Sequence, residues 1–107
     1  MTESFEIREY TESGWSPFAE WFDDLDAVTA ARVDRYVRRL EAGNFGAAKS
    51  LRDGVFELRL DFGPGYRVYF GREGRTIIIL LGGGSKRRQD ADIAATVERW
   101  KRYKQAK

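Results

Sequence analysis

Five side chains in the second half of the chain are of types that can act on a phosphodiester. They are one carboxylate and four cations, and they lie in two alternating segments and in the stretch after LLGGGS: Glu57, Arg59, Arg67, Lys86 and Arg87. Arginine and lysine stabilise the negative charge that develops on a phosphoryl group, and a carboxylate can accept a proton or orient an arginine. Cleavage of RNA by its own 2′-hydroxyl needs both kinds of group. These residues can act together only if the fold brings them to one place.

Cysteine and histidine are both absent from the 107 residues. Without thiols there is no disulfide, no thiolate nucleophile and no cysteine-ligated zinc. Without imidazole, proton transfer has to use a carboxylate, lysine, arginine or tyrosine. We therefore expect a chemistry that depends on charged side chains and uses no metal and no cofactor.

Alternating apolar residues predict two strands that carry the first two arginines. Residues 55–62 read VFELRLDF, which puts Arg59 on the face opposite the apolar side chains. A Gly63-Pro64-Gly65 turn leads to a returning strand at 66–71, which carries Arg67. If the two strands pair across this turn, both guanidinium groups can reach one phosphate.

Three glycines join a third strand to the remaining cations. Residues 77–81 are apolar on both faces, which predicts a strand with neighbours on both sides. We expect Gly82–Gly84 to turn sharply beside a bound phosphodiester that Lys86 and Arg87 hold. A tight connection from strand to helix is the simpler use of the same glycines. The stretch is not a nucleotide triphosphate loop, because Ser85 precedes the lysine and an arginine follows it.

The first half of the chain predicts a strand at 5–10 and two helices. Ser16 precedes a proline at the start of a helix whose apolar residues recur at i, i+3, i+4 and i+7: Phe18, Trp21, Phe22 and Leu25. A second helix follows Asp26, stops at Gly43-Asn44, and has one apolar face made of Val33, Tyr36, Val37 and Leu40. We expect these helices to form an antiparallel hairpin.

A C-terminal helix completes the expected fold. Asp90 is its expected cap, with Ile93, Val97 and Trp100 facing inward and a basic outer surface of Arg99, Lys101, Arg102 and Lys104. Residues 45–53 read as a loop. The element order is then β-α-α-β-β-β-α, an α+β fold with a mostly antiparallel sheet. At 107 residues the chain, 1–107, is expected to be one domain.

Charge is distributed unevenly along the chain. The first 26 residues hold eight acids and one base, whereas the other 81 hold 18 bases and 9 acids. This asymmetry predicts a positive face that binds a polyanion and an acidic region opposite it, although such charges can also serve only to solvate a surface. The N-terminus has no signal-peptide pattern, and no apolar run approaches the ~18 residues that cross a membrane. We therefore expect a cytoplasmic protein.

Four sequence blocks together resemble a known family. They are an E-L-R strand, a G-x-G-Y-R-x-Y-F strand, an apolar strand, and G-G-x-K-x-x-Q-x-x-D-I entering a helix. Glu57 to Arg59, Gly63 to Phe70 and Gly83 to Ile93 fit these blocks, with one extra residue at position 84 or 85. In this the chain resembles the RelE/ParE superfamily of bacterial toxins, and most closely the HigB-like addiction-module killer proteins.

The resemblance implies a RelE-like fold and a toxin of a type II toxin-antitoxin system. Most characterised relatives cut messenger RNA on the ribosome and are silenced by an antitoxin, here expected to be a helix-turn-helix protein that covers the positive face or the terminal helix with an acidic or amphipathic segment. The implied catalytic residues are Glu57, Arg59, Arg67, Lys86 and Arg87. The implied RNA-binding residues are Lys49, Arg52, Tyr69 and Arg88.

The general base does not follow from the resemblance. Some relatives use strand lysines and a helix tyrosine, but this chain has Glu57 and Arg59 on that strand and Ile93 near the tyrosine's place. Other relatives use histidines. The candidates here are Glu57, Lys86, Tyr66 and Tyr69, or a base that the ribosome supplies.

Several alternatives stay open at this level. Glu57 is either the general base or the partner that orients an arginine, and Arg67 could simply form an ion pair with Glu57 or Asp61 on the adjacent strand. The ParE side of the superfamily inhibits DNA gyrase by binding it, without nuclease residues. A basic binding domain without activity is a third possibility, although Trp21 and Trp100 have the spacing of core residues rather than of a base-stacking surface.

Overall fold

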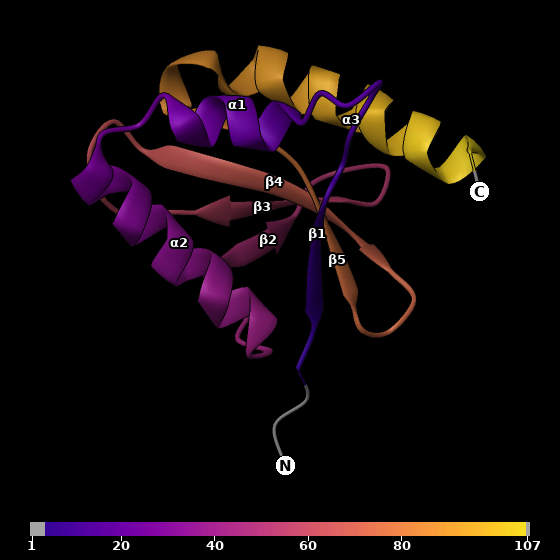
Figure 1. Cartoon of the computed structure of the whole chain (residues 1–107), viewed down its shortest axis with the longest axis horizontal. Helices are drawn as coiled ribbons and strands as arrows, with labels where there is room; N and C mark the ends of the chain where they lie inside the picture. Colours follow the sequence, from indigo (N-terminus) through magenta and orange to yellow (C-terminus); the bar gives the residue numbers. More distant parts are fainter. Residues whose placement is uncertain (1–3, 107) are drawn as a thin grey trace.

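A five-stranded sheet runs through the molecule in the order β1-β5-β4-β3-β2, as Figure 1 shows. In the computed structural model, which describes residues 4–106, the strands are β1 (Glu6–Glu9), β2 (Ala48–Ser50), β3 (Val55–Arg59), β4 (Tyr66–Glu73) and β5 (Ile77–Ser85). The β1 and β5 strands pair in parallel, whereas the pairs β2–β3, β3–β4 and β4–β5 are antiparallel. The α+β class and the mostly antiparallel sheet are confirmed.

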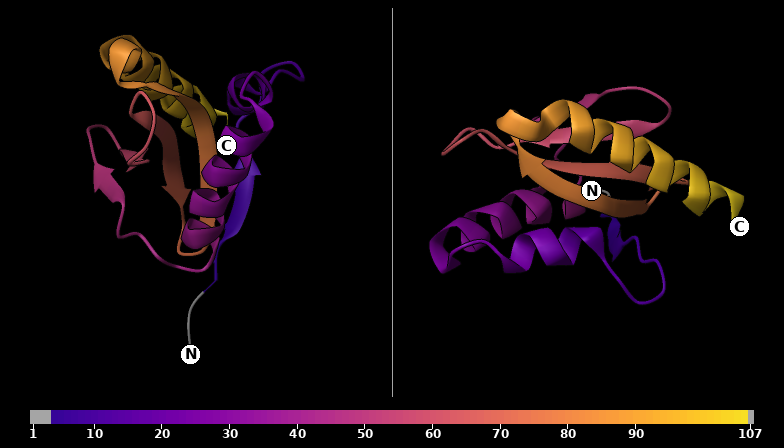
Figure 2. Two further views of the ribbon diagram at one scale, coloured as in Figure 1. Left: turned by 90° about the vertical axis from the view of Figure 1, so that its left-hand side faces the viewer. Right: turned by 90° about the horizontal axis from the view of Figure 1, so that it is seen from above.

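Helices cover both faces of this sheet (Figure 2). On one face lie α1 (Pro17–Asp23) and α2 (Ala27–Glu41), and their apolar side chains share a core with Leu58, Val68 and Leu80. On the other face lies α3 (Gln89–Gln105), which packs Val97 and Trp100 over a second core. A short 3-10 turn, η1 (Lys86–Arg88), connects β5 to α3. None of the helices in the described part of the chain is long and apolar enough to cross a membrane.

Local signals set where the first two helices begin. The Ser16 side chain accepts a hydrogen bond of 3.0 Å from the Ala19 amide, and Asp26 caps α2 in the same way through Thr29. The two helices follow one another over a short connection, as predicted, but they diverge from it, so close packing along their lengths is not found (Figure 1). The seven-residue α1 instead packs its aromatic side chains on the sheet, which leaves space between the helices.

The predicted glycine turn is also wrong. Residues 82–84 are extended strand within β5 and pair with β4, opposite residues 67–69. A Cβ on Gly83 would lie 2.2 Å from the Trp21 ring, and one on Gly84 would lie 2.0 Å from the Asp92 carboxylate. Glycine is required here because helices on both faces approach the strand closely.

Three smaller expectations need correction. Residues 48–50 form β2 within the segment expected to be a loop, because they add an edge strand to β3. Asp90 lies in the first turn of α3 rather than at its cap, which is Arg88 without a side-chain hydrogen bond. Arg99 does not face outward, since its guanidinium donates to the Leu81 carbonyl at 3.0 Å.

Candidate functional site

A buried ion pair joins the two strands of the β3–β4 hairpin on the face that α3 covers. Glu57 is opposite Tyr69 in the register and Arg59 is opposite Arg67, so all four side chains project from the same face. Arg67 Nε lies 3.1 Å from Glu57 Oε1, and the two side chains are 4% and 1% exposed. This is the ion pair that the sequence left open as an alternative for Arg67. The predicted pairing of the two strands across the turn is confirmed.

Two further side chains bind the same glutamate. Arg59 Nε lies 3.6 Å from Glu57 Oε1, and the Arg59 side chain is 53% exposed. From the beginning of α3, Gln89 Nε2 donates a hydrogen bond of 2.9 Å to Glu57 Oε2. One carboxylate oxygen therefore lies at ion-pair distance from the arginines, without a hydrogen bond among the described residues, and the other accepts a hydrogen bond from the amide. The glutamate is held as a fixed negative centre below the surface.

The Arg67 guanidinium is fixed at its other end by the turn of the hairpin. Its Nη1 donates a hydrogen bond of 2.6 Å to the Gly65 carbonyl, and the same carbonyl accepts from the Lys86 amide at 2.9 Å. A methyl group on Gly65 would lie 3.1 Å from Arg67 Nη1 and 3.2 Å from Lys86 Cβ. The backbone of Gly65 therefore lies between Arg67 and Lys86 and contacts both. The β3–β4 turn and the start of η1 meet at this point.

The surface above the ion pair is cationic. Arg59, Lys86, Arg87 and Arg88 are exposed, while Arg67 lies beneath them. Shallow hollows border both parts of this surface, one lined by residues 59–63, 65 and 67 of the hairpin and the other by residues 86–91, and each includes one carboxylate, Asp61 or Asp90. We call Glu57, Arg59, Arg67, Lys86, Arg87 and Gln89 the hairpin cluster. Four of the five residues that the sequence proposed as catalytic meet here, namely Glu57, Arg59, Arg67 and Lys86, and Arg87 follows Lys86 in η1.

The proposed RNA-binding residues are placed less uniformly. Lys49 is exposed and pairs with Glu57 in the β2–β3 register, so it extends the cationic row across the sheet, and Arg88 lies beside the cluster in η1. Arg52 is exposed but follows β2 at the opposite end of β3 from Arg59. Tyr69 is fully buried, so it offers no surface for stacking on a base.

Both tyrosines considered as bases lie in unsuitable surroundings. Burial, with a smaller contribution from the Glu57 carboxylate, raises the pKa of Tyr69 well above its ordinary value, and its hydroxyl has no hydrogen-bond partner among residues 4–106. Tyr66 packs against Trp21 and Phe62 on the opposite face of the sheet. Of the candidates for proton transfer, Lys86 is the one that is both exposed and adjacent to Arg67.

Gln89 is the member of the cluster that the sequence analysis missed. It is separated from Glu57 by 32 positions, and no local pattern pairs them. Its signal was the glutamine in the fourth block of the resemblance, to which no role was attached. The structure gives it one, which is to hold the carboxylate from the side opposite the arginines.

Comparison with known families extends over most of the chain. Residues 20–104 match the family model described as "Phage derived protein Gp49-like (DUF891)", a span that contains the whole hairpin cluster. This chain belongs to the Gp49-like family. A relative from Haemophilus influenzae, described as an uncharacterized protein, is 47% identical over 77 residues, which cover 71% of this chain and 78% of the relative. Membership of the Gp49-like family supports a toxin-like, phage-derived protein in general terms.

Proposed function

We propose that this Gp49-like protein is a growth-inhibiting toxin of the RelE/HigB kind that cleaves messenger RNA on the ribosome. The observation that carries the proposal is the hairpin cluster, in which exposed cations on β3 and η1 lie beside an arginine that a buried glutamate holds in place. An arginine that is fixed before the substrate arrives can stabilise developing charge without reorganisation. A polyanionic substrate suits this surface better than a neutral one.

The proposed cleavage step is a transesterification within the RNA. The 2′-oxygen attacks the adjacent phosphorus, the bond to the 5′-oxygen breaks, and the products are a 2′,3′-cyclic phosphate and a 5′-hydroxyl. Arg59, which is exposed, stabilises the charge on the phosphoryl oxygens, Arg67 adds positive charge from below the surface, and Arg87 binds a neighbouring phosphate. Lys86 donates a proton to the leaving 5′-oxygen.

Glu57 has an orienting role in this proposal rather than that of a general base. Its carboxylate is almost completely buried, with one oxygen facing arginines and the other accepting from Gln89. With 1% of its side chain exposed, Glu57 is not accessible to the 2′-hydroxyl of a bound RNA. The proton of that hydroxyl therefore passes to water or to a group of the ribosome-bound substrate complex. The step needs no metal ion, and the described residues 4–106 hold no group of three or more acidic side chains suited to bind one.

An antitoxin is the expected protein partner. We propose that a helix-turn-helix protein silences the toxin in the cytoplasm by placing an acidic or amphipathic segment over the cationic surface of the hairpin cluster or alongside α3, since opposite charge is what competes with RNA there. Co-expression with the neighbouring reading frame and purification of the tagged toxin test this. Recovery of the toxin alone, with growth still arrested, would reject it.

Brief induction in a bacterial host tests the proposed target. The proposal predicts that incorporation of labelled amino acids stops within minutes, before DNA breaks accumulate. A parallel arm measures supercoiling by purified gyrase, which the protein should leave unaffected. Intact protein synthesis with accumulating DNA breaks would assign the protein to the gyrase-binding class instead.

A further inference from the structure

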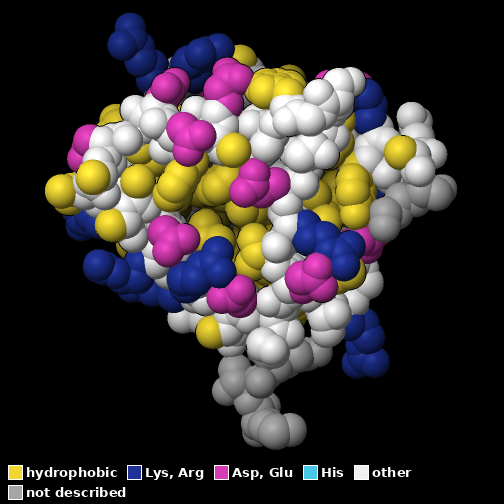
Figure 3. Space-filling model, viewed as in Figure 1, with side chains coloured by type: hydrophobic (Ala, Val, Ile, Leu, Met, Phe, Trp, Pro, Cys, Tyr) yellow, Lys and Arg dark blue, Asp and Glu magenta, His cyan; other side chains and the backbone are white. Residues whose placement is uncertain are grey.

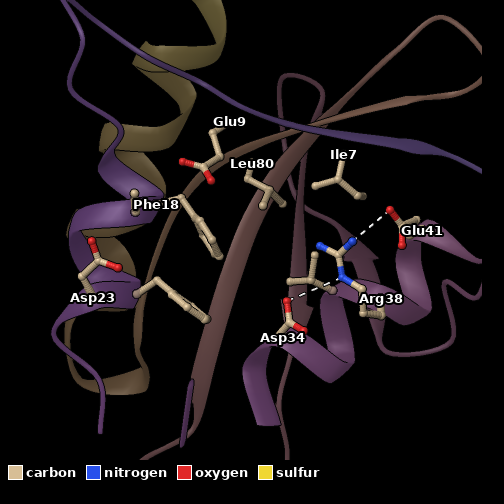
Figure 4. A pocket seen from close by; sticks show the side chains of 11 residues that line it. Ile7, Glu9, Phe18, Asp23, Asp34, Arg38, Glu41 and Leu80 are labelled. Carbon is tan, nitrogen blue, oxygen red and sulfur yellow. Dashed lines mark ion pairs between the residues drawn. The ribbon is translucent and has the colours of Figure 1, made fainter. Parts of the chain in front are cut away.

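A groove of about 430 Å³ lies between α1 and α2, on the face of the sheet opposite the hairpin cluster. Strands β1 and β5 form its floor and the two diverging helices form its walls. Figure 3 shows apolar side chains exposed in a hollow on this face. The apolar lining consists of Ile7, Phe18, Ala19, Phe22, Val37 and Leu80. Phe18 projects from α1 into the space in front of Leu80 (Figure 4).

Acidic side chains surround this groove. Four carboxylates line it, two from the side of β1 and α1 and two from α2: Glu9, Asp23, Asp34 and Glu41. Arg38 is the one cation among the described lining residues, and it lies 3.5 Å from Asp34 and 2.9 Å from Glu41 (Figure 4). Its charge is therefore compensated from within the rim. The groove is locally negative in a chain whose formal net charge is +2.

We propose that this groove binds a helical segment of another protein, one that carries a row of apolar residues flanked by lysine or arginine. The floor is a sheet face and the walls are helices, so a third helix continues the layer that α1 and α2 begin. Its apolar row covers the partly exposed Ile7, Ala19 and Phe22, and its cations meet the acidic rim. The proposal is independent of the chemistry of the hairpin cluster, which lies on the other face.

A second copy of this chain fits the groove poorly. Among residues 4–106, the exposed large hydrophobic side chains are Trp15 and Val28, at 41% and 70%. Val28 lies on α2, and Arg32 and Arg35 follow it one and two turns further along the helix. This surface therefore offers positive charge but only one exposed large apolar side chain. No described element offers the row of apolar residues that the groove would cover. A partner protein therefore meets the requirement, and self-association does not.

A pair of matched peptides tests the proposal by binding, without reference to toxicity. Each is a labelled synthetic helix of about 18 residues, roughly 27 Å long, with leucines at i, i+3, i+4 and i+7. One carries lysines beside the leucine row and the other carries glutamates. A third peptide has the lysine composition in scrambled order. Fluorescence anisotropy with the full-length protein should give the ordered lysine peptide an affinity at least about tenfold higher than the other two.

Two charge reversals locate the binding. Asp23→Lys, on the rim, should weaken binding of the lysine peptide about fivefold or more, whereas Glu98→Lys, exposed on α3, should change it less than about twofold.

The chemical shifts of backbone amides in NMR spectra should change on addition of the lysine peptide at Ala19 and Val37 and not at Lys86. Equal binding of the scrambled or glutamate peptide would overturn the proposal, as would shifts confined to the hairpin cluster. Sedimentation of the protein alone should show a monomer, and a dimer that the peptide dissociates would favour a second copy as the occupant.

Discussion

Arg67 and Glu57 form an ion pair of 3.1 Å between neighbouring strands, and neither side chain is more than 4% exposed. The position of the arginine therefore depends on the glutamate, and the glutamate is left uncompensated if the arginine is removed. Breaking a buried pair at one end costs far more than the pair contributes as a whole. A substitution of Arg67 therefore affects stability and activity together, and the two effects have to be measured separately.

Arg67→Ala should destabilise the protein by about 3 kcal/mol or more, because the buried Glu57 carboxylate loses its partner. The variant Arg67→Met with Glu57→Gln should recover most of that loss, since no buried charge remains. Urea denaturation of the single and double variants measures both effects. An Arg67→Ala protein as stable as the parent would show that the pair is not buried in solution.

Arg59→Ala and Lys86→Ala should each slow RNA cleavage about a hundredfold while the free energy of unfolding changes little. Both side chains are exposed at the hairpin cluster, so their removal leaves no buried charge. Arg35→Ala is the matched control, because it removes an exposed arginine from α2, on the opposite face of the sheet. Cleavage rates in a reconstituted translation reaction provide the measurement. A loss of activity in the control equal to that in Lys86→Ala would contradict a localised site.

Gln89→Ala should lower the free energy of unfolding by about 1.5 kcal/mol, because one oxygen of the buried Glu57 carboxylate loses its hydrogen bond. We expect kcat to fall while KM is unchanged, since the amide positions the carboxylate without touching RNA. Gln89→Asn, which keeps the amide on a shorter side chain, should recover part of the loss. A change confined to KM would instead place Gln89 in contact with the substrate.

Tyr69→Phe should raise the stability at neutral pH by about 1 kcal/mol, because a buried hydroxyl without a hydrogen-bond partner is removed. Burial raises the pKa of this tyrosine, so the stability that its neutral form contributes is complete below about pH 10 and is lost as the pH rises further. The parent should therefore lose more stability than the variant as the pH rises above about 10. Urea denaturation of both proteins at a series of pH values above about 10 measures this difference. An equal loss of unfolding free energy in parent and variant would show that the tyrosine is accessible. Unchanged cleavage by the variant would agree with the absence of a base role.

Gly83→Ala should destabilise the protein strongly, by about 2 kcal/mol or more, because its Cβ would lie 2.2 Å from the Trp21 ring. Gly46→Ala is a suitable control, since its Cβ would meet only the Asn44 side chain at 3.2 Å, on an exposed loop. Thermal melting distinguishes the two. Similar melting temperatures for both variants would mean that α1 does not pack closely on β5.

The β3–β4 hairpin and the starts of α1 and α2 could be predicted from the sequence because their signals are local. Alternation and the Gly63-Pro64-Gly65 turn were enough to predict that Arg59 and Arg67 share a face, and Ser16 and Asp26 both cap helices as their types indicate. Turns and helix caps of this kind are determined by residues a few positions apart in the chain.

Features that depend on distant elements were predicted wrongly or missed. Glycine in a sequence signals either a turn or a close approach, and only the positions of Trp21 and Asp92 show that residues 82–84 serve the second purpose. Likewise, alternation indicates that Glu57 faces away from one core, but not that α3 covers it and that Gln89 binds it. The divergence of α1 and α2 also follows from packing on the sheet, which helix periodicity does not describe.

The chemical identity of new RNA ends tests the central claim most directly. After brief induction, RNA ends that carry a 5′-hydroxyl are mapped in cells that express the parent or the Lys86→Ala variant. The account predicts new ends of this kind inside translated coding regions for the parent, and few or none for a stably folded variant. Growth arrest by the parent without such ends, or equal cleavage by both proteins, would contradict the assignment of the hairpin cluster as an RNA-cleaving site.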